Sequence, residues 1–549
     1  MKLSSHMPIP EGLSPILDAF QRAYPVGGCV RDHLLGLNPK DIDVEVYGLT
    51  YPEVVAVLEK FGKIDTVGKS FGVIKLKVGK ETFDFSFPRK DSKIEGQEGH
   101  KAFKIEVDIN LSPKEAAYRR DLTINSMAYD HRTNKILDFY GGEQDLKNKI
   151  LRHTSLHFAE DPVRVLRVMQ FAARFQSFTV APETLQMCKD IAHKQLHLSE
   201  ERVGVEFGKL LTKGIDISRG LNFLRDSEFI RHFPELEKLV NCPQDVLWHP
   251  EGDVHTHTAH CCDALAAKPE WRALPETERY VYMLGVLCHD LGKPVCTKTE
   301  FKAALGRDAI TSPGHDKEGV QYAKSLMERL DVPNAIVKRV LPLVEFHMDH
   351  LQVSTDTDIR RLAVRMKPES IQGLALITEA DHSGRPPLPK KQPDEMIHIV
   401  KRAAELGCLT EPLPAIFKGR DMLALGMKQG EGIGVLQKAA YEAQLEGKLN
   451  SMEDALKWYR ENRAKLLENA KLGPSRLLDG KDLIATGIKP GKEMGRLHRH
   501  LYELQLDGVL STKEQAVQFI IDHANEFSVP IEAVERLKET LLVNRPTIE

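Results

Sequence analysis

The sequence has no long apolar run, no CxxC cysteine pair and almost no net charge. No stretch approaches the roughly 18 uninterrupted apolar residues that a membrane-spanning helix requires. The first residues, MKLSSHMPIPEGLSP, carry prolines where the apolar part of a signal peptide would lie, so we expect a cytoplasmic protein with no membrane partner. The adjacent Cys261 and Cys262 are predicted to be buried small apolar side chains rather than part of a disulfide or zinc framework.

Charges of the two signs nearly cancel, with 76 lysines and arginines against 79 aspartates and glutamates, for a formal net charge of −3. A nucleic-acid partner would therefore have to be held by local basic patches rather than by the charge of the whole chain. The chain has 549 residues, of which 42% are hydrophobic and 28% charged. This length and composition predict several globular domains.

The most informative stretch runs from Tyr24 to Gly48 and reads YPVGGCVRDHLLGLNPKDIDVEVYG. In its last part acidic residues alternate with apolar ones, which predicts a strand with Asp41 and Asp43 on one face. Two carboxylates at this spacing can bind divalent cations, and a pair of Mg²⁺ ions held there can activate an attacking hydroxyl and neutralise a departing pyrophosphate. Taken alone, such a pair is more often an exposed strand edge.

A glycine pair upstream makes the metal-site interpretation more specific. Gly27 and Gly28 can bring backbone N–H groups close to phosphates at the start of a helix, and Arg31 would face the same phosphates from the first turn. A third acid, Asp84 in ETFDFSFPRK, would lie on the polar face of a neighbouring strand, although an ordinary exposed aspartate is an equally good interpretation. The predicted catalytic residues are Asp41, Asp43 and Asp84.

These features resemble the nucleotidyltransferase head of the tRNA CCA-adding enzymes and bacterial poly(A) polymerases, in the class that bacteria and eukaryotes share. RRDLTIN (119–125) resembles the element whose Asp and Asn contact the ribose 2′-hydroxyl, and on a helix Asp121 and Asn125 would share one face. DFYGG (138–142) resembles the hinge-like motif that follows, and EDPVRVLRVMQFAARF (160–175) resembles the helix that carries the protein template for base selection. The nucleotide-binding residues that this resemblance implies are Gly28, Arg31, Arg120, Asp121, Asn125, Glu160, Asp161, Arg164 and Arg167.

The template residues have the chemistry that base selection requires. Asp161 and Arg164 are three apart at the start of an amphipathic helix, so they would project toward one ligand as an acceptor and a donor. Cytosine and adenine each offer an exocyclic amine beside an unprotonated ring nitrogen, whereas uracil and guanine offer a carbonyl beside a ring N–H. The pair can thus select C and A without a nucleic-acid template, with Glu160 expected to hold the arginine. The alternative is an ordinary ion pair on a helix surface.

A second constellation lies between residues 249 and 385 and resembles the HD-type metal phosphohydrolase domain. Its predicted metal ligands are His257, His289, Asp290, His315, His347 and Asp381. Imidazole and carboxylate ligands suit Ni²⁺, Mn²⁺, Co²⁺ or Mg²⁺, and a metal-bound hydroxide could attack a phosphomonoester or a 2′,3′-cyclic phosphate. Whether His315 and His347 build a second metal position stays open, and His255, His260 and His350 are predicted to be bystanders.

The C-terminal part contains an internal repeat at an offset of 61 residues, with one copy beginning at Gly419 and the other at Gly480. Each copy is predicted to form a helix, a glycine turn and a second helix. The second copy carries RLHRHLYEL (496–504), a basic cluster that could meet tRNA phosphate, although a solvated helix face is the default interpretation. A proline-rich stretch, GRPPLPKKQP (384–393), is predicted to link the HD domain to this tail.

We therefore expect an α+β protein with a mixed-sheet, polymerase-beta-like nucleotidyltransferase head, followed by an all-α neck, an HD domain and helical C-terminal repeats. The expected domains are the head at 1–145, a helical neck with the base-reading helix at 146–240, the HD domain at 241–395, and tail repeats at 396–470 and 471–549. A polar stretch at 86–116 resembles the flexible loop that complete CCA-adding enzymes keep, which favours the whole CCA product over a shorter one.

The resemblance implies an enzyme that binds the 3′ end and acceptor region of tRNA and adds CCA from CTP and ATP, with Mg²⁺ in the head. The nearest alternative is the addition of A alone or of a poly(A) tail by the same chemistry. In a different class, the head would be a tRNA-binding platform without catalysis and the HD centre the only enzyme. A nucleotide-signalling HD hydrolase is a further alternative, but it would not explain the base-reading helix.

Overall fold

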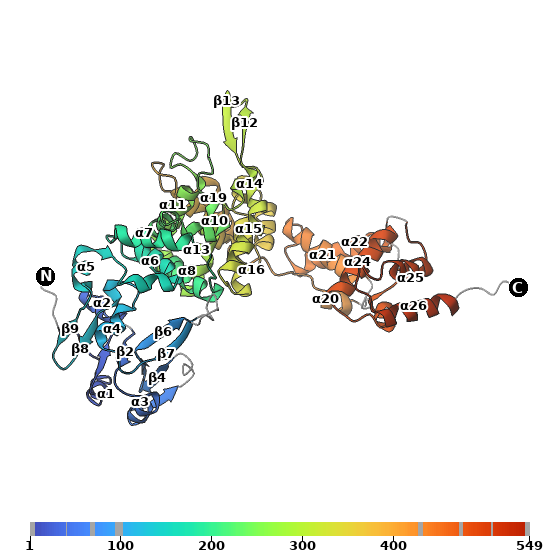
Figure 1. Ribbon diagram of the computed structural model, residues 1–549. Helices are drawn as coiled ribbons and strands as arrows, with labels where there is room; N and C mark the ends of the chain where they lie inside the picture. Colours follow the sequence, from blue (N-terminus) through green and yellow to red (C-terminus); the bar gives the residue numbers. More distant parts are fainter. Residues whose placement is uncertain are drawn as a thin grey trace. The chain divides into compact units, whose positions relative to one another are not determined.

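The computed structural model describes residues 6–39, 41–65, 72–93, 103–425, 432–471, 476–506 and 509–543. The chain divides into two compact units, 1–413 and 414–549, and each is described by itself. A mixed sheet lies in the N-terminal part and helices make up most of the rest (Figure 1), so the predicted α+β class is confirmed. Among the described residues, no helix is both long and apolar enough to cross a membrane.

The head is built on a five-stranded sheet. Its strands, in spatial order, are β1 (Ala23–Pro25), β2 (Asp43–Val46), β5 (Glu81–Ser86), β4 (Val73–Val78) and β3 (Lys63–Asp65). Strands β2 and β5 run parallel, whereas the other neighbouring pairs are antiparallel. The predicted alternation is present, because Val44, Phe83 and Phe85 are buried while Asp43 and Asp84 lie between the buried positions. The sheet therefore has an apolar face toward the core and a face that carries acids.

The remaining elements of the head surround this sheet. They are α1 (Ser14–Asp18), α2 (Gly28–Leu34), α3 (Tyr51–Leu58), β6 (Arg89–Lys93), β7 (Phe103–Val107), α4 (Pro113–Tyr118), β8 (Ala128–Asp130), β9 (Lys135–Leu137) and α5 (Gly142–Asn148). Strands β6 and β7 pair antiparallel within the stretch 86–116 that was expected to be a loop. Residues 94–102 lie outside the described residues. The alternation of apolar and polar residues in FKIEV (103–107) is the strand signal that the loop prediction overlooked.

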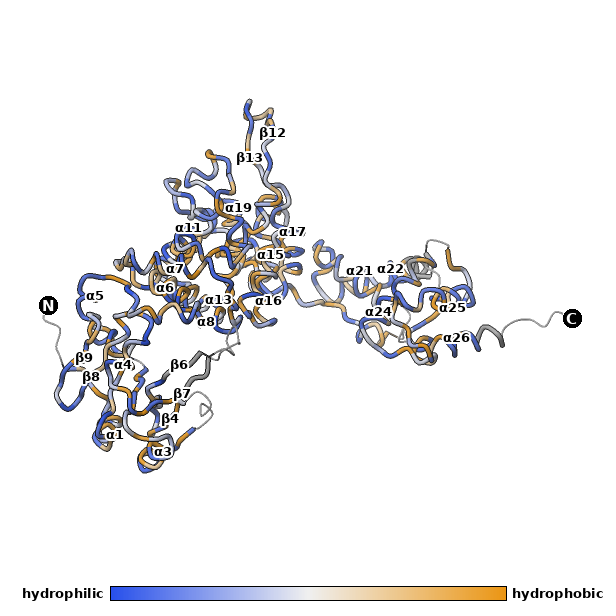
Figure 2. The backbone as a smooth tube through the Cα atoms, in the orientation of Figure 1, coloured by the Kyte–Doolittle hydropathy of each residue, from blue (hydrophilic) through white to orange (hydrophobic). Residues whose placement is uncertain are grey.

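Helices form the neck and the middle of the first unit. The principal ones are α6 (Val163–Arg174), α7 (Pro182–Ala192), α8 (Glu200–Lys213), α9 (Ile217–Asp226), α11 (Val254–Ala266), α13 (Glu276–Cys288), α15 (His315–Arg329), α16 (Asn334–Glu345), α17 (Asp356–Arg365), α18 (Ile371–Ser383) and α19 (Asp394–Glu405). Helix α6 packs on α8 and α9, and α11 packs on α9, α13 and α18. Apolar and polar positions are interspersed along these helices (Figure 2), and the apolar ones join a single core that extends from Met7 to Cys408.

The proline-rich stretch 384–393 does not lead into the tail, contrary to the sequence-based expectation. It joins α18 to α19, and α19 buries Met396, Ile399 and Ala403 in the core of the first unit. The division between the two units falls after Leu413. Proline-rich composition here marks a turn between packed helices, because proline breaks a helix without ending a domain.

The second unit confirms the internal repeat. The first copy contains α20 (Gly419–Ala424), α21 (Ile433–Leu445) and α22 (Met452–Lys471), and the second contains α23 (Gly480–Ala485), α24 (Lys492–Leu506) and α25 (Lys513–Asp522), followed by α26 (Ile531–Val543). The copies share a hydrogen bond at the same offset: Gln444 Oε1 accepts from Ile416 N at 2.9 Å, and Gln505 Oε1 accepts from Leu477 N at 3.1 Å. Each copy buries its own apolar cluster.

Replacement of Phe207 should destabilise the first unit strongly. Its side chain is fully buried on α8, with its ring centroid 5.0 Å from that of Phe233. Phe207→Ala should lower the free energy of unfolding of the first unit by about 3–5 kcal/mol, because it leaves a cavity in a core that cannot collapse around it. Urea denaturation followed by circular dichroism measures this change. Phe301→Ala, at a position that is 67% exposed, is the matched control and should change the value by less than about 0.5 kcal/mol. Equal effects of the two substitutions would contradict this description of the core.

Candidate functional site

Three acids of the head come together on neighbouring strands. Parallel pairing of β2 with β5 puts Asp43 in register with Asp84, whereas Asp41, which was expected on the same strand, lies two residues before β2 begins. Burial raises the pKa of the Asp43 carboxyl, and the negative charge of Asp84 raises it further. Lys75, on β4, pairs with Asp84 at 2.9 Å. Carboxylates crowded in this way repel one another, so the group has the donor set and the charge to hold a divalent cation.

The glycine pair shapes the turn between β1 and α2. Gly27 has φ of +74°, and a Cβ atom added there would lie 3.0 Å from the guanidinium of Arg120, so both backbone conformation and space favour glycine. Its N–H donates to Met127 O at 3.0 Å, and α2 begins at Gly28. Arg120 pairs with Glu45 at 3.4 Å. The N–H of Gly27 is therefore used within the fold, while Arg120 lies beside the turn where phosphates are expected.

The side chain of Arg31 lies deeper in the fold than a side chain that contacts a bound phosphate from the first turn of a helix. Its side chain is buried and donates to Asn125 Oδ1 at 2.6 Å and to Asp32 at 2.8 Å. The guanidinium also lies over the rings of Phe171 and Phe175, 5.2 and 5.5 Å from their centroids. Arg31 thus ties α2 to the RRDLTIN segment and to the C-terminal end of α6, where Phe171 lies in the last turn and Phe175 follows it.

Asp121 and Asn125 contact each other, but they do not share an α-helix. Only the short 3-10 helix η3 (Thr123–Asn125) forms here, and Asn125 Nδ2 donates to Asp121 Oδ1 at 3.1 Å across it. Arg167 of α6 pairs with Asp121 at 2.9 Å. Burial alone would raise the pKa of Asp121, but the charge of Arg167 and the hydrogen bond from Leu122 N lower it. The helical spacing argument therefore paired the right residues for the wrong reason.

The template residues are held in place by neighbours. Asp161 pairs with Arg202 of α8, while Arg164 donates to His157 O at 2.6 Å and to Arg119 O at 2.9 Å. Arg164 lies in the first turn of α6, whereas Asp161 precedes the helix, contrary to the expectation that both belong to it. Glu160, which was expected to hold Arg164, pairs with Arg119 at 3.2 Å and with His157 at 2.6 Å. Arg202 was not among the predicted site residues, and its contact makes it a direct partner of Asp161.

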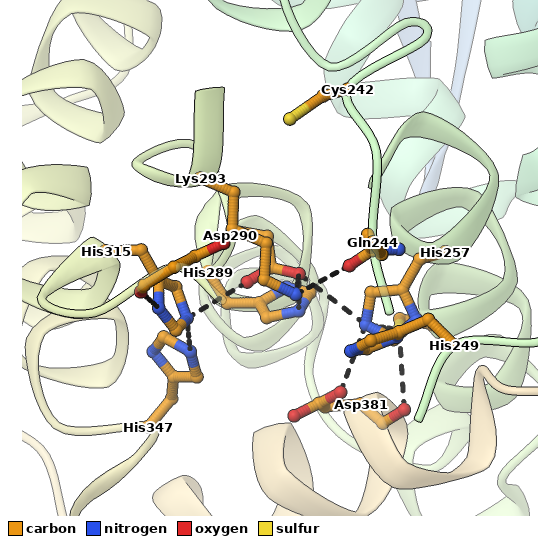
Figure 3. Close-up of polar contacts among 12 residues, drawn as sticks. Cys242, Gln244, His249, His257, His289, Asp290, Lys293, His315, His347 and Asp381 are labelled. Carbon is orange, nitrogen blue, oxygen red and sulfur yellow. Dashed lines mark hydrogen bonds and ion pairs between the residues drawn. The ribbon is translucent and has the colours of Figure 1, made fainter. Parts of the chain in front are cut away.

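The histidines and aspartates of the middle segment converge on one point, as Figure 3 shows. His257 Nε2, from α11, lies 3.1 Å from Asp381 Oδ1 of α18 and 3.6 Å from Asp290 Oδ2. His289 Nε2 lies 3.2 Å from the same oxygen of Asp290, just after α13. Within the described residues, His289 Nε2 is buried without a hydrogen-bond partner. A buried imidazole nitrogen facing carboxylate oxygens fits a divalent metal position.

Asp290 connects this group to a second one. Its other oxygen, Oδ1, lies 3.2 Å from His315 Nε2, which in turn lies 3.2 Å from His347 Nε2. One carboxylate thus faces two clusters of imidazole nitrogens (Figure 3), a donor set that suits divalent cations. Lys293 also contacts Asp290, at 2.7 Å.

The Nδ1 atom of each of these histidines has an acceptor, which turns Nε2 toward the centre. His289 donates to Val286 O at 2.6 Å, His315 to Ser312 O at 2.7 Å and His347 to Val344 O at 2.7 Å. Nδ1 of His257 lies 2.7 Å from Glu251 Oε1. Burial lowers the pKa of His347 to about 3, and His315 and His289 lower it as well, so its ring is neutral and able to bind a cation.

Sequence reasoning missed two residues of this centre, His249 and Glu251. The Glu251 carboxylate is fully buried and contacts His249 Nδ1 at 2.9 Å as well as His257. Both residues lie within eight positions of His257, so the clustering of histidine and acid in HPEGDVH (249–255) was the available signal. Cys261, predicted to be a plain buried side chain, is buried but lies 3.4 Å from His257 Nε2.

The predicted bystander histidines occupy different surroundings. His255 is buried and contacts Asn222 at 3.3 Å, and His350 donates to His347 O at 2.9 Å. A cavity of about 670 Å³ opens onto the centre, and His350 lines it together with Asp290, His315, His347 and Asp381. Within this lining, Asp290 and Asp381 come from the first cluster, and His315 and His347 from the second.

Comparison with known proteins agrees with this geometry. Residues 23–152 match the family described as poly A polymerase head domain, and residues 177–239 match the probable RNA and SrmB-binding site of polymerase A. The multifunctional CCA protein of Acinetobacter baumannii strain SDF is 34% identical over 415 residues, which cover 73% of this chain and 94% of that protein.

Solved structures share the fold. The Bacillus stearothermophilus CCA-adding enzyme in complex with CTP superposes with a TM-score of 0.56 at 19% identity, covering 84% of this chain and 100% of that one. The Thermotoga maritima CCA-adding enzyme in complex with tRNA gives a TM-score of 0.51 at 18% identity, covering 86% and 98%. The sheet with its acids, the matching head domain and the relative aligned over most of both chains lead to one conclusion: this chain belongs to the family of bacterial CCA-adding enzymes.

Proposed function

We propose that this chain adds CCA to the 3′ end of tRNA from CTP and ATP, and that its middle segment hydrolyses phosphate esters at a separate metal centre. The observation that carries the first activity is the register of Asp43 with Asp84, with Asp41 one step away. When bound there, Mg²⁺ would activate the tRNA 3′-hydroxyl and neutralise the leaving pyrophosphate. Arg120, beside the turn at Gly27, is the residue best placed to contact the phosphates of the incoming nucleotide.

Base selection is proposed to rest on Asp161 and Arg164. Arg202 pairs with Asp161 and positions its carboxylate, which can accept from the exocyclic amine of cytosine or adenine. Two backbone carbonyls hold Arg164, which fixes the plane from which its guanidinium donates to the ring nitrogen. With uracil or guanine, the Asp161 carboxylate would face a carbonyl oxygen, which is also an acceptor. The Arg164 guanidinium would face a ring N–H, which is also a donor.

The proposed hydrolase centre uses His257, His289, Asp290 and Asp381 for one divalent cation, with His315 and His347 sharing Asp290 for a second. We propose that the cation is Ni²⁺, Mn²⁺, Co²⁺ or Mg²⁺. A cation bound there supplies a hydroxide nucleophile near neutral pH. Glu251 and the backbone carbonyls behind the rings hold the imidazoles in the tautomer that leaves Nε2 free for the cation.

Asp43→Asn should abolish nucleotide addition and leave hydrolysis unchanged. Loss of this carboxylate removes a cation ligand of the head, and a fall of at least about 100-fold in the rate of CTP incorporation is expected. Single-turnover incorporation into a tRNA transcript measures it, with hydrolysis of p-nitrophenyl phosphate assayed in parallel. Asp65→Asn, on β3 of the same sheet, is the matched control and should retain activity. Near wild-type addition by Asp43→Asn would refute the assignment of the head.

Asp161→Ala should relax base selection. Loss of the acceptor should reduce discrimination of CTP against UTP by roughly 10-fold, because a mismatched pairing costs about 1–3 kcal/mol. Triphosphate affinity should change less, since the phosphates are held elsewhere in the head. Competitive incorporation of CTP, UTP, ATP and GTP measures this, with Asp226→Ala on α9 as the control. Unchanged fidelity in the Asp161 variant would show that this residue does not read the base.

Asp290→Asn should remove bound metal and hydrolysis together while nucleotide addition continues. The carboxylate faces both clusters, so its loss should affect both cation positions. Elemental analysis and turnover of 2′,3′-cyclic AMP with each metal measure the effect, and the exposed Asp308→Asn is the control. If the wild-type protein holds no metal and turns over no phosphate ester with any of the four metals, the centre is structural only.

A further inference from the structure

Strand β2 carries a third acid, Glu45, that the proposed reaction does not yet use. Glu45 lies two residues after Asp43, so both side chains project from the same face of the sheet. In the register of the sheet it faces Tyr24 of β1 and Ser86 of β5, in the row next to that of Asp43 and Asp84. Glu45 is only 8% exposed, and a buried carboxylate needs partners that hold it.

Two neighbours hold the Glu45 carboxylate. Its Oε2 atom accepts from the hydroxyl of Tyr47 and lies 3.4 Å from Arg120 Nη2. Tyr47 is buried, with its ring centroid 5.9 Å from that of Tyr24 and 5.5 Å from the guanidinium carbon of Arg22. The carboxylate is therefore fixed by Tyr47 on one side and faces Arg120 on the other.

Arg120 reaches this carboxylate from the RRDLTIN segment and touches the glycine turn at the same time. Its Nη1 atom would lie 3.0 Å from a Cβ atom added at Gly27, whereas its Nη2 atom faces Glu45. The guanidinium is planar, so contacts at its two ends fix the direction in which its remaining N–H groups point. A long arginine side chain that is held in this way loses less conformational freedom when it binds an anion.

The contact between Glu45 and Arg120 leaves the guanidinium able to bind a further anion. At 3.4 Å it is longer than the bidentate contacts of Arg307 with Asp245, at 2.8 and 2.9 Å, and 24% of the Arg120 side chain is exposed. A carboxylate that only neutralised the arginine would be expected to take both ends of the fork. The hydrogen bond from Tyr47 also keeps Glu45 turned toward Arg120.

We propose that Glu45 is a positioning residue for nucleotide addition, which holds Arg120 beside the turn at Gly27 so that its guanidinium meets the phosphates that leave as pyrophosphate. This inference rests on the proposed nucleotide addition and on the phosphate contact of Arg120. CTP and ATP carry the same phosphates, so Glu45 should act equally on both nucleotides. It should not act on base selection, which is assigned to Asp161 and Arg164.

Kinetics of the full-length protein test this role. Glu45→Ala should raise KM for CTP and for ATP about 10-fold each and leave kcat within about threefold, because a hydrogen bond that holds a charged group is lost. Discrimination against UTP should stay unchanged, unlike in Asp161→Ala. Glu45→Gln keeps an acceptor and should restore most of the loss, and the exposed Glu81→Ala on β5 is the matched control. Unchanged KM values, or a loss of discrimination as large as the change in KM, would overturn the proposal.

Binding of pyrophosphate in the presence of Mg²⁺ tests the same contact without turnover. Measured by isothermal titration calorimetry, Glu45→Ala and Arg120→Ala should each weaken binding about 10-fold, and the double variant should bind no more weakly than Arg120→Ala alone. A further loss of the same size in the double variant, or tighter binding by Glu45→Ala, would show that Glu45 does not act through Arg120.

A milder variant keeps the test decisive if Glu45→Ala does not fold. Tyr47→Phe removes only the hydroxyl that fixes the carboxylate, and it should weaken pyrophosphate binding about threefold when Arg120 is present and not at all when Arg120 is replaced by alanine. Equal weakening in both backgrounds, or none in either, would contradict the positioning role.

The outcomes also separate this inference from the function on which it rests. Pyrophosphate binding that depends on Glu45, without nucleotide incorporation by the wild type, would contradict nucleotide addition alone. Normal incorporation with a pyrophosphate affinity that does not depend on Glu45 would contradict the positioning role alone.

Discussion

An ion pair between Asp121, which is buried, and Arg167, which is partly exposed, ties helix α6 to the RRDLTIN segment of the head. Asp121 also accepts from Leu122 N and Asn125 Nδ2, so loss of Arg167 would leave a buried carboxylate with only part of its partners. Because Arg167 belongs to α6, the same pair orients the helix that contains Arg164 and directly follows Asp161. Base selection by a protein requires this rigidity, since hydrogen-bond donors and acceptors discriminate bases only when their positions do not adapt to the wrong one.

Much of the head could be predicted from local patterns, whereas its contacts could not. Alternation of acids with apolar residues predicted β2 correctly because strand periodicity is a local property. Spacing on a presumed helix also paired Asp121 with Asn125, although the segment is a 3-10 turn. The partner of Asp161 is Arg202, which lies 41 residues later in the chain. Only the packing of α6 on α8 brings the two together. Such long-range pairs leave no periodic signal in a single sequence.

In the middle segment, too, the motifs predicted which residues come together but not how those residues are arranged. The six predicted ligands lie together, but the sharing of Asp290 between two clusters depends on the packing of α11, α13, α15 and α18. Glu251 was missed although it lies near His257 in the sequence. An acid that contacts the Nδ1 atom of a histidine has no fixed sequence spacing from that histidine. In the tail, by contrast, the repeat with an offset of 61 residues could be identified from the sequence alone. The equivalent glutamines Gln444 and Gln505 make the same hydrogen bond in the two copies.

The central proposal is that one site in the head selects C and A in succession, after which nucleotide addition stops. The most direct measurement incubates tRNA transcripts ending before CCA, after C and after CC with labelled CTP and ATP, singly and together, and resolves the products by length. The account predicts that all three transcripts are completed to CCA and extended no further, with ATP used only after the second C. Addition of A alone, a growing poly(A) tail, or no addition to any transcript would contradict it.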